Sequence, residues 1–373
     1  MPNSMCKIGK RERNVRFFVF HFALLALFAL NFVAVAGAQR HDLGWIWQNP
    51  LPQGNQLNAV HFAKDKLNGL AVGSDNTVLR TTDGGFSWTR FSSPVDSPLT
   101  DVYVKDKKRA IIVGTRGTIL SLVDGQYLEQ VHITTKEHLN GLTFVDSDNN
   151  TGWAVGTHGT ILKSADGGLT WIQQTSATTE HLFRVSAYDS QNAAAVGSNG
   201  TVLTTNDGGL TWKSVEPCKA EQMTGVAFVA QRQIIVSGHN GCIARSDDGG
   251  ANWDRINTFS RVDFLAISFS DNKAGSVTDA NGLVWLTGDG GTTWLPFNVR
   301  TNPKLSDVYF VDRFTGWAVG ENGLITRTDD GGYSWRRQAN GVREDINDLA
   351  FFNDLLGVAA GSKGRIMISN DGG

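Results

Sequence analysis

Eight aspartates recur along the chain at an almost constant interval, and they are the first candidates for chemistry. Successive members lie 41 or 42 residues apart, at Asp83, Asp124, Asp166, Asp207, Asp248, Asp289, Asp330 and Asp371. Carboxylates can act as general acids and bases or as calcium ligands. Eight equivalent carboxylates, however, cannot all belong to one active site. We therefore predict a structural role for them, with no catalytic residue, no metal and no cofactor.

The residues around each aspartate form a motif that resembles the Asp-box of bacterial neuraminidase repeats. Most copies follow the pattern Ser/Thr-x-Asp-x-Gly-x-Ser/Thr-Trp, with the tryptophan at Trp88, Trp171, Trp212, Trp253, Trp294 and Trp335. The carboxylate can accept hydrogen bonds from backbone N–H groups of its own turn, and the tryptophan can bury a large ring. The copy at Asp124 has Glu129 in place of the tryptophan. We expect a looser blade or an adapted surface there.

Four short strands are predicted in each repeat. In the third copy they are residues 142–145, 152–156, 160–164 and 170–173. The second and third strands are joined by a short turn that is Asn-Gly in several copies, such as Asn199-Gly200, and this dipeptide favours a type I′ hairpin. A period of about 41 residues with four antiparallel strands is typical of a β-propeller blade. The predicted fold is therefore all-β, a single propeller.

The number of repeats predicts eight blades, with seven as the alternative. The last repeat ends within its Asp-box, before its fourth strand, whereas Trp47 lies 41 residues before Trp88. A propeller has no open edge if its N-terminal strand completes its last blade. We therefore expect residues around 44–50 to pair with residues around 358–370.

The N-terminal region has the composition of a targeting segment. Five basic residues precede an apolar run from Phe17 to Val35, and Ala36-Gly37-Ala38 follows. This order predicts a secretory signal peptide over residues 1–38, with an uncleaved membrane anchor as the alternative. The propeller would then occupy residues 39–373, in the periplasm or outside the cell. The remaining 29 basic and 35 acidic side chains give a formal charge of −6, which argues against a nucleic-acid partner.

Two cysteines remain beyond the predicted signal, Cys218 and Cys242. A disulfide between them is compatible with an exported protein, and two isolated apolar thiols are an equal alternative.

Basic side chains recur at one position of the repeat. The residue three positions before the Asp-box aspartate is Arg80, Lys163, Arg245 or Arg327 in four of the eight copies. With Arg116 on a neighbouring turn, these could form a basic band that binds an acidic protein segment. The alternative is a set of ordinary solvent-facing strand residues.

A wider resemblance covers essentially all of residues 41–373. The segment Gly316-Trp317-Ala318-Val319-Gly320, followed by Asp330-Gly331-Gly332 and Trp335, resembles the photosystem II stability/assembly factor family. The resemblance implies a non-enzymatic propeller, usually seven-bladed, that binds the D1 protein in the thylakoid lumen of oxygenic phototrophs. It thus implies a protein partner and no small-molecule substrate, and we expect a monomer. The alternative function is a glycoside hydrolase of the sialidase or xyloglucanase type, because those enzymes also carry Asp-boxes.

Overall fold

The computed structural model describes residues 46–47, 57–65, 67–84, 89–145, 150–219, 221–299, 305–310, 312–320, 324–337 and 345–372. The chain divides into two compact units, Met1–Leu43 and Gly44–Gly373, and every described residue belongs to the second. The predicted signal peptide or anchor therefore lies outside the described residues. Within the described ranges, no helix is long and apolar enough to cross a membrane.

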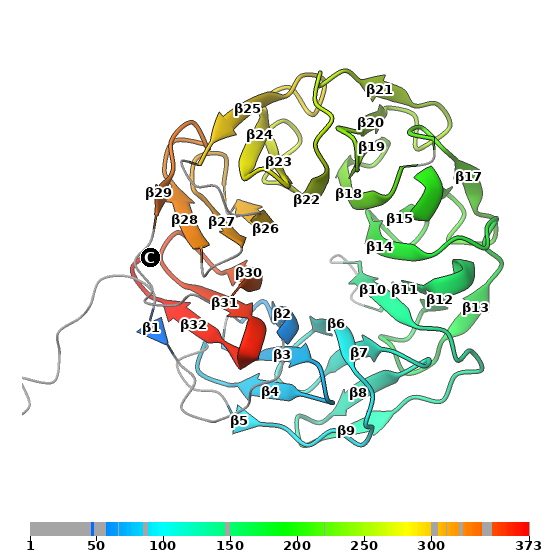
Figure 1. Cartoon of the computed structure of the whole chain (residues 1–373). Helices are drawn as coiled ribbons and strands as arrows, with labels where there is room; N and C mark the ends of the chain where they lie inside the picture. Colours follow the sequence, from blue (N-terminus) through cyan, green and yellow to red (C-terminus); the bar gives the residue numbers. More distant parts are fainter. Residues whose placement is uncertain are drawn as a thin grey trace, which may run out of the picture. The chain divides into compact units, whose positions relative to one another are not determined.

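Eight four-stranded antiparallel sheets form a ring in the second unit, which confirms the prediction of an eight-bladed propeller (Figure 1). The first strand of each blade lies nearest the centre, and the fourth lies at the perimeter. The strands are, for blade 1, β2 Leu57–Phe62, β3 Gly69–Gly73, β4 Val78–Thr81 and β5 Thr89–Arg90; for blade 2, β6 Leu99–Val104, β7 Ala110–Gly114, β8 Ile119–Val123 and β9 Tyr127–Gln130; for blade 3, β10 Leu139–Phe144, β11 Gly152–Gly156, β12 Ile161–Ser164 and β13 Ile172–Gln174; for blade 4, β14 Leu182–Ala187, β15 Ala193–Gly197, β16 Val202–Thr205 and β17 Lys213–Val215.

The second half of the ring repeats the arrangement. The strands are, for blade 5, β18 Met223–Ala230, β19 Gln233–Gly238, β20 Ile243–Ser246 and β21 Asp254–Ile256; for blade 6, β22 Phe264–Phe269, β23 Gly275–Asp279, β24 Leu283–Thr287 and β25 Leu295–Asn298; for blade 7, β26 Leu305–Phe310, β27 Gly316–Gly320, β28 Leu324–Thr328 and β29 Arg336–Arg337; for blade 8, β30 Ile346–Phe351, β31 Gly357–Gly361, β32 Ile366–Ser369 and β1 Ile46–Trp47.

The N-terminal strand β1 completes blade 8. Ile46 pairs with Ile368 and Trp47 with Met367 in antiparallel register, which confirms the predicted closure. Figure 1 shows β1 beside β32 at the outer edge of that blade. The fourth strand of the last blade thus comes from the other end of the sequence, so all eight blades have four strands and only short outer edges.

All four predicted strands of blade 3 are observed, but the first begins earlier, at Leu139, and the fourth begins later, at Ile172. The reason for the earlier start is a bulge, since the register between β10 and β11 shifts between Leu139 and Gly141. The same irregularity occurs in the first strand of every blade. An alternating pattern cannot continue through an inserted residue, and the strand is therefore cut short when it is predicted from periodicity.

The turn between the second and third strands has the predicted left-handed conformation. In blade 3 the φ angles of His158 and Gly159 are 53° and 67°, and Thr160 N–H donates to the Thr157 carbonyl at 3.1 Å. Both central residues of a type I′ turn need positive φ. A Cβ on Gly159 would also lie 2.0 Å from the carbonyl oxygen of Thr178, so the next connection leaves no room for a side chain.

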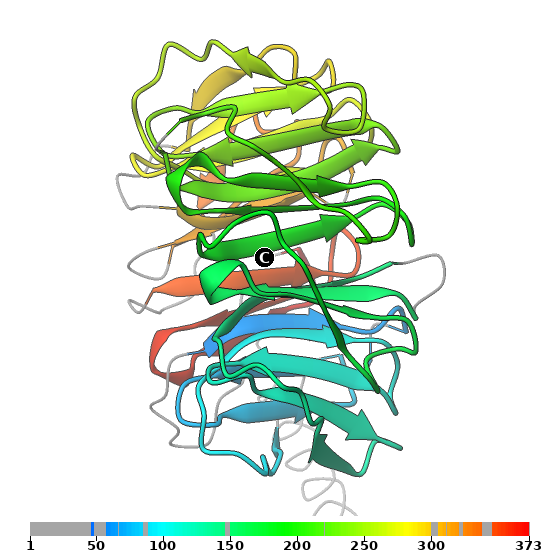
Figure 2. The same ribbon diagram turned by 90° about the vertical axis from the view of Figure 1, so that its right-hand side faces the viewer.

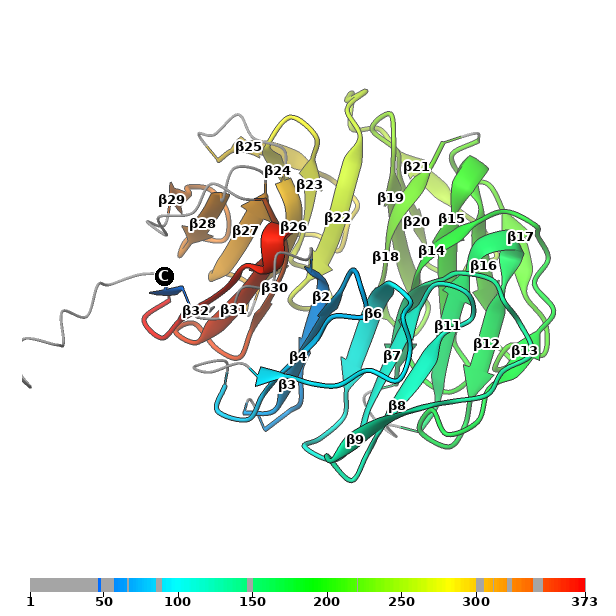
Figure 3. The same ribbon diagram turned by 60° about the horizontal axis from the view of Figure 1, so that its bottom comes forward.

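The blades pack face to face around the ring, as the side view in Figure 2 and the tilted view in Figure 3 show. Eight buried apolar clusters occupy the eight blade interfaces. The cluster between blades 8 and 1 joins Leu57 and Phe62 to Val358 and Ile368. Each such side chain stabilises the fold by about 1.5–3 kcal/mol when fully buried. Closure therefore rests on this packing as well as on the β1–β32 pairing.

The ring has two different faces. One carries the Asp-box turns between third and fourth strands together with the loops between first and second strands, and we call it the Asp-box face. The two kinds of loop contact each other, as when Gly167 N–H donates to the Asn150 carbonyl at 2.8 Å. The opposite face carries the turns between second and third strands and the connections between blades, as when Gly159 N–H donates to the Glu180 carbonyl.

Candidate binding face and central channel

The Asp-box carboxylates are engaged by their own turns. Asp166 accepts hydrogen bonds from the Ser164 hydroxyl at 2.8 Å and from the N–H and hydroxyl of Thr170 at 3.0 and 2.6 Å. The same contacts recur around Asp207, where the hydroxyl and N–H of Thr211 lower the carboxyl pKa to about 2. The carboxylates are distributed one per blade, and in the described ranges no three His, Cys, Asp or Glu side chains are grouped to hold a metal ion.

Most of the described Asp-box tryptophans form a hydrogen bond within their own turn. The indole N–H donates to the carbonyl of the second Asp-box glycine in four copies, at Trp171, Trp253, Trp294 and Trp335. Trp212 instead donates to the Gln174 side chain of the preceding blade at 3.0 Å. Trp88 lies outside the described residues. These contacts give the tryptophans a packing function within the ring.

Blade 2 replaces the Asp-box with a tight hairpin. Asp124 and Gly125 both have positive φ, at 49° and 71°, and the pairing of β8 with β9 extends to the Val123–Tyr127 pair beside the turn. This ladder contains four residue pairs, whereas the corresponding ladder in blade 3 contains three. The divergent copy is therefore not a looser blade; its turn is shorter and its strands are paired further.

The four third-strand cations point along the ring into the next blade. The Lys163 ammonium donates to the Gly208 carbonyl at 2.7 Å, and the Arg327 guanidinium donates to the Gly372 carbonyl at 2.7 Å. Arg80 reaches the Gly125 carbonyl, and Arg245 reaches the Thr292 hydroxyl. In each case the acceptor belongs to the turn between the third and fourth strands of the following blade.

These cations alternate around the ring, because they occur only in blades 1, 3, 5 and 7. The side chains of Arg245 and Arg327 are only 15% and 12% exposed. Arg116 is separate from them, on the opposite face, where its N–H donates to His138 Nδ1 at 3.3 Å. The structure thus does not bring the five predicted cations together on one surface. Their predicted partner-binding role stays a prediction, and four of them connect neighbouring blades.

Three carboxyl groups that sequence reasoning missed lie in the central channel, a cavity of about 260 Å³. Asp101, Asp307 and Asp348 occupy equivalent positions of their first strands, each paired with the second strand directly after the bulge. Arg184 occupies the same position in blade 4. An alignment of the eight repeats at this position could have identified these carboxyl groups from the sequence, because Asp307 and Asp348 are one repeat apart.

The channel carboxyls hold their protons more tightly than ordinary aspartates. Burial raises the pKa of Asp101 to about 6, against the opposing effects of Arg184 and of the hydrogen bond from Leu142 N–H. Burial also raises the pKa of Asp307 and of Asp348, and the two carboxyls share a hydrogen bond. Asp348 also accepts a hydrogen bond from Val60 N–H at 2.7 Å. These carboxyls therefore link blades 2 to 3, 7 to 8 and 8 to 1.

Most exposed large apolar side chains lie on the Asp-box face. In the described part of the chain this face carries Leu67, Leu169, Tyr188, Leu210, Phe314, Tyr333 and Leu355. Among the other exposed residues of this kind, Phe259 lies in a connection on the opposite face, and Tyr127, Ile172 and Leu295 lie on fourth strands. Apolar side chains on a surface mark interaction sites when they are gathered and not scattered.

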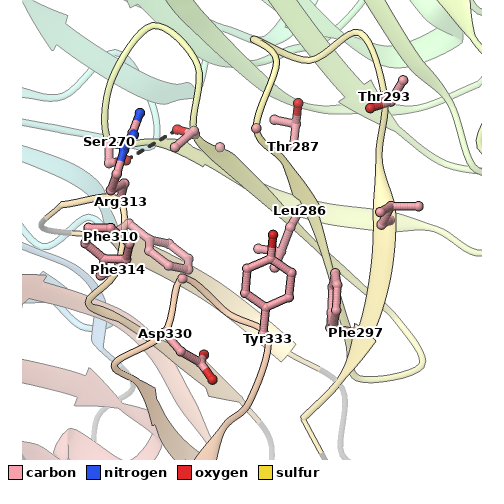
Figure 4. A pocket seen from close by; sticks show the side chains of 15 residues that line it. Ser270, Leu286, Thr287, Thr293, Phe297, Phe310, Arg313, Phe314, Asp330 and Tyr333 are labelled. Atoms are coloured by element: carbon pink, nitrogen blue, oxygen red, sulfur yellow. Dashed lines mark hydrogen bonds between the residues drawn. The ribbon is translucent and has the colours of Figure 1, made fainter.

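Two cavities open on the Asp-box face. The outer one, about 260 Å³, lies between blades 6 and 7, and Figure 4 shows Leu286, Tyr333 and Phe297 along its wall. The Tyr333 and Phe297 rings meet edge to face at 5.0 Å. Arg313, whose guanidinium pairs with Asp271 at 3.2 Å, borders the same cavity. The inner one, about 440 Å³, lies near the channel between blades 7, 8, 1 and 2.

The model of a family described as Photosynthesis system II assembly factor YCF48 matches residues 86–173, 126–216, 176–296 and 292–373. The chain belongs to this family. No curated protein sequence matches it significantly. The family relationship therefore rests on the repeat pattern that the family model describes, over most of the propeller.

Solved structures share the fold at low sequence identity. YCF48 from Cyanidioschyzon merolae is 20% identical, with a TM-score of 0.58 over 88% of this chain and 98% of that one. A structure of YCF48 bound to D1 peptide is 17% identical, with a TM-score of 0.58 over 89% and 96%. An ancestral GH74 enzyme is 14% identical, with a TM-score of 0.61, and this chain covers 55% of it. At these identities the likeness shows the propeller fold alone.

Proposed function

We propose that this protein is an exported, non-enzymatic scaffold that binds a protein segment on the Asp-box face of its propeller. The observation that carries the proposal is membership of the YCF48 family, one member of which has been solved with a D1 peptide. Where the organism has photosystem II, the partner would be D1 or another component of its assembly.

The positions and contacts of the carboxyl groups support a non-catalytic role. A glycoside hydrolase needs two carboxyl groups about 5–5.5 or 6.5–9.5 Å apart, on either side of the bond to be cleaved. Asp307 and Asp348 are hydrogen-bonded to each other, so no glycosidic bond fits between them. The Asp-box carboxylates are bound to their own turns, as Asp166 is. The GH74 neighbour is matched over only about half its length, which favours the scaffold over the glycosidase alternative.

Export is supported by a cross-link within the second unit. Cys218 and Cys242 form a disulfide with a Cα–Cα distance of 6.1 Å, which joins the connection before blade 5 to a turn of that blade. Disulfides persist mainly in oxidising compartments such as the periplasm. With the apolar segment Phe17 to Val35, this favours a signal peptide, cleaved after Ala38. The intact mass of the protein isolated from its own cells tests the cleavage.

Affinity capture tests the function. The tagged full chain is expressed in its own organism and recovered from the envelope fraction, with proteins quantified by mass spectrometry against a tag-only control. We expect one or a few envelope proteins at near-stoichiometric amounts. Recovery of photosystem subunits would support the assembly role. Recovery of other envelope proteins would support a scaffold whose partner is not D1. Turnover of an aryl glycoside that one Asp or Glu substitution abolishes would contradict the proposal. Sedimentation of the purified chain tests whether it is monomeric.

A further inference from the structure

The inner cavity of the Asp-box face has aromatic walls. Tyr309 of blade 7, His61 of blade 1 and Tyr103 of blade 2 line it, and they occupy equivalent positions, two residues after the bulge pair of their first strands. Blade 8 has Ala350 at this position. Blade 8 lies between blades 7 and 1, so its methyl group is flanked by rings and leaves space between them.

The walls of this cavity are fixed by their own contacts. The His61 and Tyr103 rings lie 4.7 Å apart, and His61 Nδ1 accepts a hydrogen bond from Val104 N–H at 3.0 Å. The Phe62 and Phe352 rings meet edge to face at 4.5 Å on the other side. Preformed aromatic cavities of about 300–1,000 Å³ are typical ligand sites. At about 440 Å³, this one can take one large apolar side chain.

Basic residues surround the cavity on one side. The first loops of blades 1 and 2 carry six basic residues against two acids, namely Lys64, Lys66, Lys105, Lys107, Lys108 and Arg109 against Asp65 and Asp106. The formal charge of these loops is +4, in a sequence whose residues 39–373 carry −6. Lys64 and Lys105 line the cavity itself. The first loops of blades 4 and 8 instead contain the acids Asp189 and Asp354 and no basic residue. In blades 6 and 7 one acid and one basic residue balance each other, Asp271 with Lys273 and Asp312 with Arg313.

The two acids of these basic loops bind within their own turns. Asp65 accepts hydrogen bonds from Leu67 N–H and Asn68 N–H. Asp106 accepts from Lys108 N–H and pairs with the Arg109 guanidinium at 2.6 Å. Both carboxylates therefore face their own backbone, while the side chains of Lys64, Lys107 and Lys108 are exposed.

We propose that the inner cavity and these two basic loops form the site for an acidic peptide segment with one bulky aromatic side chain. The aromatic side chain occupies the cavity beside Ala350, and the flanking carboxylates lie against the lysines of blades 1 and 2. The charge asymmetry between blades fixes the direction in which the segment leaves the cavity. This inference rests on the proposed function, since it names the chemistry of the protein partner.

A synthetic probe tests the charge requirement. The full chain is titrated with a fluorescent glutamate-rich peptide that has one central tryptophan, and anisotropy is followed at increasing salt. We expect K64E/K107E/K108E to weaken binding at least about tenfold, because exposed ion pairs are individually weak and three are reversed together. Binding should also weaken with salt, as exposed charge pairs do.

The opposite face provides a matched control. Lys136, Lys219 and Lys363 are exposed there, so K136E/K219E/K363E makes the same change in net charge. We expect this variant to bind the peptide within about twofold of the wild type, because its charges are on the far side of the ring. Equal losses in both triple variants would show a net-charge effect and would overturn the site.

The cavity has its own test. Ala350→Phe fills the space, and it should lower affinity for the tryptophan peptide to that of the same peptide with alanine at the centre. Thermal melting shows whether Ala350→Phe folds. If it does not, the affinity of Phe352→Ala, which widens the cavity, for the tryptophan peptide is measured in its place. An equal affinity of the wild type for the tryptophan and alanine peptides would overturn the role of the cavity.

Three results would refute the inference as a whole: no binding of the acidic peptide, peptide binding that K64E/K107E/K108E leaves unchanged, or binding of vesicles containing anionic phosphatidylglycerol in place of the peptide. Affinity capture distinguishes failure of this site from failure of the proposed function. If the wild type and K64E/K107E/K108E capture the same envelope partner equally well, the proposed scaffold function is supported and this site is wrong. If the wild type captures no protein at all, the scaffold itself is wrong.

Discussion

Arg327 connects blade 7 to blade 8 beside the point where the ring closes, and Arg327→Met should destabilise the propeller. Its guanidinium donates to the carbonyls of Asp354 and Gly372 at 2.8 and 2.7 Å and lies over the Trp317 ring at 5.1 Å. Trp317 donates to the same Gly372 carbonyl at 3.2 Å. The side chain is 12% exposed, so water replaces these contacts poorly after the substitution.

The magnitude follows from the two charged hydrogen bonds to the carbonyls of blade 8. The guanidinium also pairs with the Asp329 carboxylate at 2.7 Å, but that carboxylate is exposed, so this pair contributes little. Bonds of this kind contribute about 1.5–3 kcal/mol each, and the cation–π contact adds about 0.5–1 kcal/mol. Methionine keeps the unbranched stem and some ring contact, so we expect a net loss of about 3 kcal/mol. The unfolding entropy of a unit the size of Gly44–Gly373 is about 0.7 kcal/mol/K, which converts that loss into a Tm decrease of about 4 °C.

Thermal unfolding by circular dichroism is the assay, and Arg336→Met is the control. Arg336 lies on the neighbouring strand β29, and its side chain is 72% exposed, so its loss should change stability by less than about 0.5 kcal/mol. A Tm for Arg327→Met within about 1 °C of the wild type would refute the reasoning. Lost partner capture at an unchanged Tm would instead support the partner-binding role of this cation.

Three further predictions concern closure, the channel and the disulfide. Cysteines replacing Trp47 and Met367 should cross-link in the folded chain, since these residues are paired, and a non-reducing gel that shows only free thiols would contradict closure by β1. The raised pKa of Asp101, about 6 against 3.8 unfolded, means that its contribution to stability is full below pH 3.8 and is lost as pH rises through 6. After allowance for its partial exposure to the channel, the loss is about 1–2 kcal/mol, and Asp101→Asn should flatten the decline of Tm between pH 4 and 7; parallel pH profiles would contradict this. Reduction of Cys218–Cys242, which closes a loop with a sequence separation of 24, should lower stability by about 3 kcal/mol, because the open loop gains entropy in the unfolded state. An unchanged Tm after full reduction would contradict this.

The period of the Asp-box predicted most of the fold. It determined the number of blades, the order of strands and the pairing of Trp47 with Met367, because each repeat carries its own turn chemistry. These features are local in sequence or follow from the repeat count. The bulge at Leu139 was missed because it interrupts the alternation on which strand prediction depends.

The site was less predictable, because it depends on contacts between blades. Lys163 has the pattern of a solvent-facing strand residue, and only the position of the next Asp-box turn shows that its ammonium meets the Gly208 carbonyl. Asp101 likewise has the pattern of an exposed strand residue until the ring encloses it. The inner cavity depends on Ala350, whose significance appears only beside Tyr309 and His61 of other blades.

Cross-linking mass spectrometry in the native envelope tests the central claim, that a protein partner binds the Asp-box face, most directly. Exposed lysines are present on both faces, with Lys64, Lys107 and Lys108 on the Asp-box face and Lys136 and Lys363 on the opposite one. We expect an amine-reactive cross-linker to join a single partner protein to the first group and not to the second. Cross-links to that partner through Lys136 and Lys363, with none through Lys64, Lys107 or Lys108, would contradict it.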